Sequence, residues 1–167
     1  MFAVVRGKAG SSYTPGLLAL REGPLLEAAV RSLTEKPDVV IVDATGRDHP
    51  RRAGLALHLG ALLDLPSVGA THRPLLARGA TPPDEEGATT PLLLDEELVG
   101  YWVRTRRAVR PLAVHAAWRT SPDVAVAVAL ALCRGSRAPE PLRLARRAAR
   151  EARAQDERGF SALSGGK

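Results

Sequence analysis

Apolar and polar positions along the first half of the chain divide into short stretches that predict strands and helices in turn. Apolar runs at residues 2–6, 38–42 and 67–70 predict strands. The run at 38–42 is nearly continuous in β-branched residues, which is typical of a strand buried on both faces. Apolar residues at helical spacing predict helices over residues 24–33 and 51–63.

The second half shows the same two periodicities. Residues 99–105 and 112–115 predict strands that pair as a hairpin. Residues 121–133 predict a helix, because Ser121 offers a capping hydroxyl and is followed by proline and an acidic residue. Basic residues at three- and four-residue intervals mark a last helix over residues 143–158.

Strands that alternate with helices predict a single α/β layered domain. A chain of 167 residues suits one domain, which we expect to span residues 1–158, with a flexible tail over residues 159–167. At 45% hydrophobic and 25% charged residues the chain can bury a core. Because only 4% of the residues are aromatic, that core must consist mainly of Leu, Val and Ala.

Charge and cysteine content narrow the function classes. The formal net charge of +6 favours a polyanionic partner. The single cysteine, Cys133, excludes an internal disulfide and a cysteine-based zinc site, and its apolar surroundings favour a small buried side chain. No apolar run approaches the ~20 residues of a membrane span, and the apolar start is too short for a signal peptide, so we expect a cytoplasmic protein.

Two segments carry the most specific signal. Residues 13–22 read Tyr-Thr-Pro-Gly-Leu-Leu-Ala-Leu-Arg-Glu, and residues 39–51 read Val-Val-Ile-Val-Asp-Ala-Thr-Gly-Arg-Asp-His-Pro-Arg. They set Glu22 at the head of a helix and Asp43 at the end of an apolar strand. This is where a nuclease of the ribonuclease-H-like kind holds a divalent cation, which activates water and neutralises charge on the leaving oxygen.

These segments resemble the signature of the endonuclease V family, whose members carry Tyr-x-Pro-Gly-x-Leu-x-x-Arg-Glu and Val-Asp-Gly-His-Gly-x-x-His-Pro-Arg. The resemblance extends from about Arg6 to Pro141. It implies a ribonuclease-H-like layered sheet with flanking helices and metal-dependent cleavage of phosphodiesters near deaminated purines in DNA or RNA. It also implies that Glu22 and Asp43 are the catalytic carboxylates that bind Mg²⁺ or Mn²⁺.

The chain departs from the family at other catalytic positions. The family's first-strand aspartate has no counterpart, since Met1 aligns with the start of the third strand. The family's Gly-His pair aligns with Ala117 and Trp118, and an indole neither binds a metal nor relays a proton. The family's lysine aligns with His72. We therefore expect weak metal binding and impaired catalysis, with His115 as one possible substitute for the lost histidine.

The resemblance also implies a nucleic-acid-binding surface. The segment around Tyr13 and Pro15 matches a strand-separating wedge, although Tyr13 also suits a lid over the core. A methyl group at Ala44, where the family has glycine, narrows the matching base pocket. We expect Arg51 to open a helix and hold a phosphate, the alternative being a solvated first turn. The implied contacts are Tyr13, Pro15, Gly16, Leu18, Arg21, Ala44, Gly46, His49, Arg51 and His72.

The basic helix over residues 143–158 has two interpretations. Its arginines share one broad face and suit a nucleic-acid backbone. The same residues also suit a solvated face partly paired with acidic residues of the helix. The arginines are Arg143, Arg146, Arg147, Arg150 and Arg153, and the acidic residues are Glu151, Asp156 and Glu157.

Without the family's first strand, the sheet is expected to have an open edge. Such an edge invites association, so we expect a homodimer or another partner that closes it. A natural protein that begins earlier than this sequence is the alternative. Two rivals to the nuclease remain open: a non-catalytic module that binds nucleic acid or protein, and an enzyme that uses the old base pocket for a small molecule.

Overall fold

The computed structural model describes residues 3–12, 14 and 16–164 of the chain. Within them, a five-stranded sheet has the order β1-β2-β5-β4-β3, and its strands are β1 (Val40–Val42), β2 (Ser67–Thr71), β3 (Thr89–Leu94), β4 (Glu97–Val103) and β5 (Leu112–Ala116). β1 and β2 are parallel, and the other neighbours are antiparallel. The helices are α1 (Leu18–Arg31), α2 (Leu55–Leu63), α3 (Pro122–Cys133) and α4 (Glu140–Ser164).

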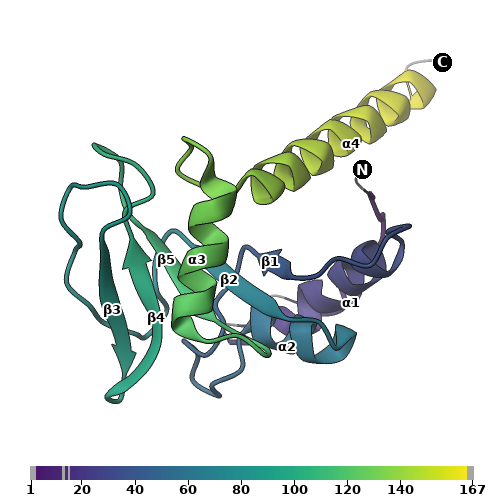
Figure 1. Ribbon diagram of the computed structural model, residues 1–167. Helices are drawn as coiled ribbons and strands as arrows, with labels where there is room; N and C mark the ends of the chain where they lie inside the picture. Colours follow the sequence, from purple (N-terminus) through teal and green to yellow (C-terminus); the bar gives the residue numbers. More distant parts are fainter. Residues whose placement is uncertain (1–2, 13, 15, 165–167) are drawn as a thin grey trace.

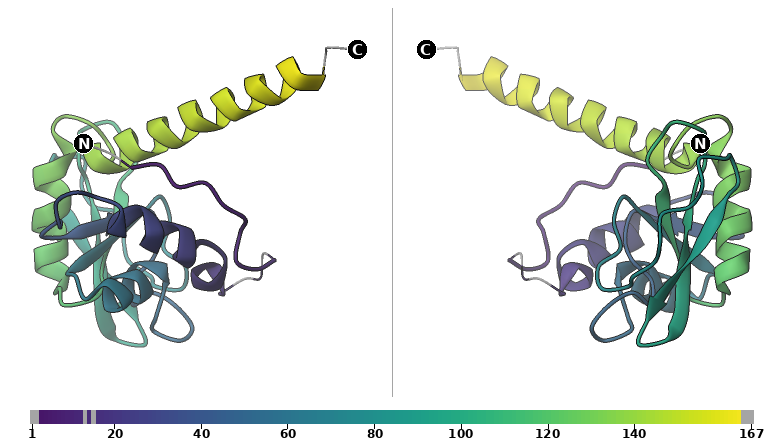
Figure 2. Two further views of the ribbon diagram at one scale, coloured as in Figure 1. Left: turned by 90° about the vertical axis from the view of Figure 1, so that its right-hand side faces the viewer. Right: turned by 90° about the vertical axis from the view of Figure 1, so that its left-hand side faces the viewer.

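Helices cover both faces of the sheet (Figure 1; Figure 2). On one face, α1 and α2 pack over β1, where Val40 and Val42 join buried leucines of α2. On the other face, α3 packs over β2, β4 and β5, where Val68 and Ala70 meet Ala125. Because the buried hydrophobic residues are Leu, Val and Ala together with Cys133, the predicted composition of the core is confirmed.

α4 leaves this layered body and projects from it (Figure 1; Figure 2). Its first turns are anchored, since Leu142 belongs to the core beneath α3 and Ala148 is buried. Farther along, Asp156 forms an ion pair of 2.9 Å with Arg6, which ties the N-terminal segment to the helix. No helix in the described part of the chain is both long enough and apolar enough to cross a membrane.

The α/β class, the strands near residues 38–42 and 67–70, and the β4–β5 hairpin agree with the sequence prediction. The helix at 121–133 is confirmed together with its cap, because the Val124 amide donates to the Ser121 hydroxyl. α1 begins at Leu18 rather than at residue 24.

Other predictions were wrong. Residues 3–6 form no strand and pair with no sheet edge; Phe2 lies outside the described residues. α2 begins at Leu55, so Arg51 does not open a helix. The pattern also missed β3, whose Pro91 argues against a strand but is tolerated because β3 is an edge strand. α4 extends to Ser164, and the division into a domain over residues 1–158 and a flexible tail stays a prediction.

Candidate metal and nucleic-acid site

A cavity of about 260 Å³ opens at the end of β1. Its walls come from the segment before α1, the first turn of α1, the loop after β1 and the end of β2. Predicted site residues that line it are Gly16, Leu18, Asp43, Ala44 and His49. The two family-like segments, distant in sequence, therefore meet at one cavity.

Main-chain and side-chain hydrogen bonds hold the two segments together. The Arg51 guanidinium donates to the Gly16 carbonyl at 3.2 Å, and the Arg51 amide donates to His49 Nδ1 at 3.2 Å. Gly16 has a φ of +75°, which an L side chain rarely adopts. Arg51 thus supports the cavity from the loop that precedes α2, instead of from a helix terminus.

Gly46 has a structural role that the sequence did not reveal. It does not line the cavity, and a Cβ at this position would collide with the carbonyl oxygen of Ala116 on β5. Its own carbonyl accepts a hydrogen bond of 2.7 Å from the amide of Gly54. The close approach of the loop to β5 therefore requires glycine here.

Asp43 follows β1 directly and lies at the mouth of the cavity, with 48% of its side chain exposed. Its carboxylate forms an ion pair with Arg146 of α4, whose side chain is 33% exposed. A carboxylate in this position suits Mg²⁺ or Mn²⁺, which are bound by hard oxygen ligands. Arg146 supplies positive charge at the oxygen that a metal ion would use.

Glu22 lies on α1, one turn after Leu18 and Ala19, which line the cavity. Residues three and four apart share one face of a helix, so Glu22 belongs to the face of α1 that borders the cavity. It is exposed and makes no ion pair within the described residues. The described part of the chain contains no group of three or more His, Cys, Asp or Glu side chains arranged to hold a metal.

Two carboxylates therefore remain as candidate ligands: Asp43, which lines the cavity, and Glu22, which lies on α1 and is not among the residues that line it. Mg²⁺ keeps several waters and needs only one or two protein carboxylates together with a substrate phosphate. Such a site at Glu22 and Asp43 would require Arg146 to release Asp43. That they act together as the catalytic pair stays a prediction.

His72 follows β2 and is exposed. Its pKa is lowered from the usual value, first by partial burial and then by the nearby charges of Arg137 and Arg146, while Asp43 acts in the opposite direction. The imidazole of His72 is therefore uncharged at neutral pH. His72 thus lies in the electrostatic surroundings of the candidate carboxylate, as its alignment with the family's lysine implies.

Several other predicted contacts lie elsewhere or have structural partners. Tyr13 and Pro15 are outside the described residues. Arg21 donates to the Ser11 carbonyl at 3.1 Å, which holds the loop before α1. Trp118 has a buried Nε1 that finds no hydrogen-bond partner among the described residues, and its ring lies 5.8 Å from the guanidinium carbon of Arg119.

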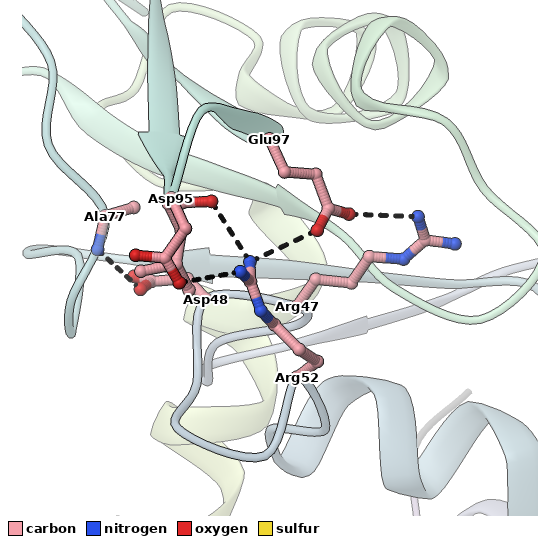
Figure 3. A network of polar contacts seen from close by, with 7 residues as sticks. Arg47, Asp48, Arg52, Ala77, Asp95 and Glu97 are labelled. Atoms are coloured by element: carbon pink, nitrogen blue, oxygen red, sulfur yellow. Dashed lines mark hydrogen bonds and ion pairs between the residues drawn. The ribbon is translucent and has the colours of Figure 1, made fainter.

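A buried carboxylate beside the cavity was missed by the sequence analysis. Asp48 is fully buried and accepts hydrogen bonds from the amides of Leu75, Leu76 and Ala77 at 2.5, 2.8 and 2.7 Å. The bond to Ala77 is drawn in Figure 3. Leu75 lines the cavity, so Asp48 fixes one of its walls.

His115 completes this buried group. The Thr71 hydroxyl donates to the Arg73 carbonyl at 2.7 Å and lies 3.1 Å from His115 Nε2. A hydroxyl has one hydrogen, so we assign the imidazole proton to Nε2 as the donor to Thr71. Nδ1 then carries a lone pair, which explains why it has no hydrogen-bond partner although it is 4.0 Å from Asp48.

Burial lowers the pKa of His115 to about 4, against the opposing effect of the Asp48 charge. The ring is fully buried and does not line the cavity at Asp43. The substitution of His115 for the family's lost histidine is therefore not supported by its position. Its observed role is to join β5 to the end of β2 through Thr71.

The loop after β1 is also fixed to the β3–β4 hairpin by charge (Figure 3). Arg52 forms ion pairs with Asp95 at 2.9 Å and with Glu97 at 3.2 Å, and it donates to the Leu94 carbonyl. Arg47 lies 3.8 Å from the same Glu97. The Arg52 guanidinium is therefore paired with carboxylates of the protein. Of the two neighbouring arginines, Arg51 is the one whose guanidinium contacts the cavity wall, at Gly16.

On α4, ion pairs support a solvated face for part of the basic surface, and its contact with a nucleic-acid backbone stays a prediction. Arg147 pairs with Glu151 at 2.8 Å, and Arg153 pairs with Glu157 at 2.9 Å, as expected for a solvated helix. Arg146 instead reaches Asp43. The helix is therefore not a uniform cationic strip, because Arg146, Arg147 and Arg153 are each paired with a carboxylate.

Comparisons with known proteins show the family of this chain. A model of the family described as Endonuclease V matches residues 2–147. An endonuclease V of Gloeobacter violaceus is 47% identical over 134 residues, which is 80% of this chain and 54% of that protein. The crystal structure of endonuclease V from Streptomyces avermitilis superimposes with a TM-score of 0.82 at 39% identity, covering 87% of this chain and 64% of that one.

A more distant structure shares the fold. It is an endonuclease V of Ciona intestinalis in complex with a DNA that contains an inosine followed by a ribo-adenosine, with a TM-score of 0.75 at 22% identity, covering 90% of this chain and 71% of that one. The chain spans 54% and 64% of the Gloeobacter and Streptomyces relatives. Its five-stranded sheet and flanking helices have the ribonuclease-H-like arrangement of these structures. The chain belongs to the endonuclease V family.

Proposed function

We propose that this protein is a metal-dependent phosphodiester hydrolase that acts on nucleic acid near a deaminated purine, with low turnover. The observation that carries the proposal is the cavity at the end of β1, where Asp43 meets Gly16, Ala44 and His49. The Ciona relative binds a DNA that contains inosine, and the same class of lesion is the candidate substrate here.

Each element of the cavity has a role in this proposal. Asp43 and Glu22 would hold Mg²⁺ or Mn²⁺, and the ion would supply activation of water and neutralisation of charge on the leaving oxygen. The backbone at Gly16 and Ala44 contacts the flipped base, and the Ala44 methyl group restricts its size. Arg51 and His72 contact the phosphates. The wedge role of Tyr13 and Pro15 stays a prediction of the family resemblance.

Low turnover follows from the local charge and from the departures from the family. The ion pair with Arg146 competes with a metal ion for Asp43. Trp118 stands where the family has histidine, and its indole transfers no proton at neutral pH. Loss of one group that stabilises transition-state charge costs about 2.7–4 kcal/mol, as measured for an oxyanion-hole donor in another hydrolase.

The test is cleavage of oligonucleotides that contain one inosine, in DNA and in RNA, with Mn²⁺. We expect slow nicking by the full chain that is lost in Asp43→Asn and Glu22→Gln. Asp38→Asn is the matched control, because Asp38 is an exposed carboxylate just before β1 and does not line the cavity. Equal activity in Asp38→Asn and Asp43→Asn would contradict the assignment of Asp43.

A non-catalytic nucleic-acid-binding module is the second candidate, and the Asp43–Arg146 pair favours it. In that case the full chain binds inosine-containing strands in a salt-sensitive manner but cleaves none of them with either metal. Absence of both binding and cleavage would contradict both candidates and leave the small-molecule enzyme.

We further propose that a second copy or another partner pairs with β1. Within the described residues β1 has β2 as its only strand neighbour, so its other edge offers free backbone donors and acceptors. Light scattering on the purified chain at tens of micromolar tests this. A monomer mass over the whole concentration range contradicts the homodimer.

A further inference from the structure

A second and larger cavity, of about 570 Å³, adjoins the first. Thr71 lines the smaller cavity and His72, the next residue, lines the larger one. The two cavities therefore lie near each other at the end of β2. A volume of this size suits a small organic ligand or one unit of a polymer.

One wall of the larger cavity is an aromatic ring. Trp102 of β4 lines it and is only half-buried. Beneath it, Leu92, Val99 and Ala113 form a buried cluster against which the indole packs. A partly exposed indole that lines a cavity and packs against a buried cluster provides apolar surface on which a base can stack.

Two charged residues that line the cavity, Arg104 and Asp84, already have partners within the protein. Arg104 is nearly buried and donates to the carbonyls of Pro82, Pro83 and Val109, so it builds the wall. Asp84 accepts from the Ala108 amide at 2.9 Å and lies 3.6 Å from Arg104. Both are satisfied by the protein itself.

Arg110 is the free cation. Its side chain lines the cavity, is exposed, and makes no hydrogen bond or ion pair within the described residues. Its charge contributes to lowering the pKa of Arg137, after partial burial, and Arg137 in turn contributes to lowering the pKa of His72. Because these positive charges repel one another, an anion bound among them is favoured.

We propose that this larger cavity binds one unpaired nucleotide that flanks the nucleotide held in the smaller cavity, with its base stacked on Trp102 and its phosphate at Arg110. The chemistry is that of a single-strand subsite, in which an aromatic face accepts any base and a guanidinium holds the backbone. His72 lies at the junction and contacts the phosphate between the two nucleotides. The subsite rests on the proposed function for its substrate class.

The experiment measures binding and requires no cleavage. The chain contains two tryptophans. In a Trp118→Phe background, fluorescence therefore reports on Trp102 alone. This protein is titrated, in EDTA, with single-stranded tetranucleotides of thymidine and with inosine-containing strands extended on either side of the lesion. We expect quenching of Trp102 by every strand that reaches the cavity.

Variants then assign the two contacts. Trp102→Leu keeps apolar bulk over the core but removes the ring, and loss of stacking worth about 1–3 kcal/mol per base predicts at least about fivefold weaker binding, measured by fluorescence anisotropy of a labelled strand. Arg110→Ala reduces the slope of log affinity against log salt by about one. Arg107→Ala, an exposed arginine of the same hairpin loop that does not line the cavity, leaves affinity and slope nearly unchanged.

Several outcomes overturn the subsite. One is unchanged strand binding in folded Trp102→Leu and Arg110→Ala. Another is equal quenching by a fully paired duplex, because a paired base cannot stack on Trp102. Binding of thymidine monophosphate as tight as that of the tetranucleotide indicates a mononucleotide site instead. The cleavage proposal and the subsite can fail independently. Asp43→Asn is expected to abolish cleavage of inosine-containing oligonucleotides but to leave the quenching of Trp102 fluorescence unchanged.

Discussion

Asp43 and Asp48 stand five positions apart in one loop and have opposite environments. Asp48 is fully buried, and three backbone amides satisfy its carboxylate. Asp43 is about half exposed at the mouth of a cavity, and one arginine from α4 is its charged partner. The first carboxylate fixes the wall of the cavity, and the second remains available for exchange with a metal ion.

The difference teaches how to separate structural from functional acids in this fold. A carboxylate that accepts several amide hydrogen bonds in the core cannot change partners without exposing unsatisfied donors. A carboxylate with a single, partly solvated ion pair exchanges partners at little cost. Both acids lie in the family-like segment, yet only Asp43 has the accessibility that metal binding requires.

The largest expected effect is on stability. Asp48→Ala leaves the amides of residues 75–77 without their acceptor, and hydrogen bonds to a charged group are worth about 1.5–3 kcal/mol each. We expect the free energy of unfolding to fall by about 3 kcal/mol or more, measured by urea denaturation. Asp43→Ala, which removes one partly exposed ion pair, should cost less than about 1 kcal/mol. Equal losses in the two variants would remove the proposed distinction.

The buried group also predicts a pH dependence. The pKa of His115 is about 4 in the folded protein, against 6.5 for an unperturbed histidine, so the unfolded chain binds more protons between these values. Stability is therefore fully present above pH 6.5 and falls as the pH decreases toward 4, by an amount on the order of 3 kcal/mol. Denaturation curves across this range measure the loss.

His115→Gln provides the control for that prediction. Its side chain does not titrate, and its amide can still donate to Thr71. We expect a flatter stability profile between pH 6.5 and 4 for this variant than for the natural chain. Parallel profiles would show that other groups cause the acid sensitivity.

The smallest expected effect concerns the exchangeable carboxylate. Arg146→Ala removes the cation paired with Asp43, and Mn²⁺ should bind about two- to fivefold more tightly, as expected for loss of a partly solvated ion pair. Titration followed by electron paramagnetic resonance of free Mn²⁺ measures this. The matched control is Arg147→Ala, because Arg147 pairs with Glu151 on the same helix. A similar gain in both variants would indicate a general charge effect.

Much of the fold follows from local sequence. The β-branched run before Asp43 gives β1, and Ser121 with Pro122 gives the capped start of α3. The pattern failed where a partner outside the segment decides the outcome. Residues 3–6 have a strand-like composition but pair with no sheet edge, while β3 contains Pro91 and still forms because β4 pairs with it.

The candidate site divides in the same way. The motifs predicted that Gly16, Ala44 and Asp43 belong together, and the structure places them around one cavity. The pattern did not reveal that Arg146 reaches Asp43 from more than a hundred residues away, or that Asp48 and His115 are buried beside each other. Neither contact has a local signature, because each depends on how distant elements pack.

The sequence by itself determined the family, the α/β class and the motifs that meet at the cavity, because these depend on residue identity and on periodicity within short segments. The tertiary structure alone decided which acid is accessible, which cation opposes it and where the second cavity lies. Accessibility and electrostatic environment depend on packing between elements far apart in the chain, and no short stretch of residues records that packing.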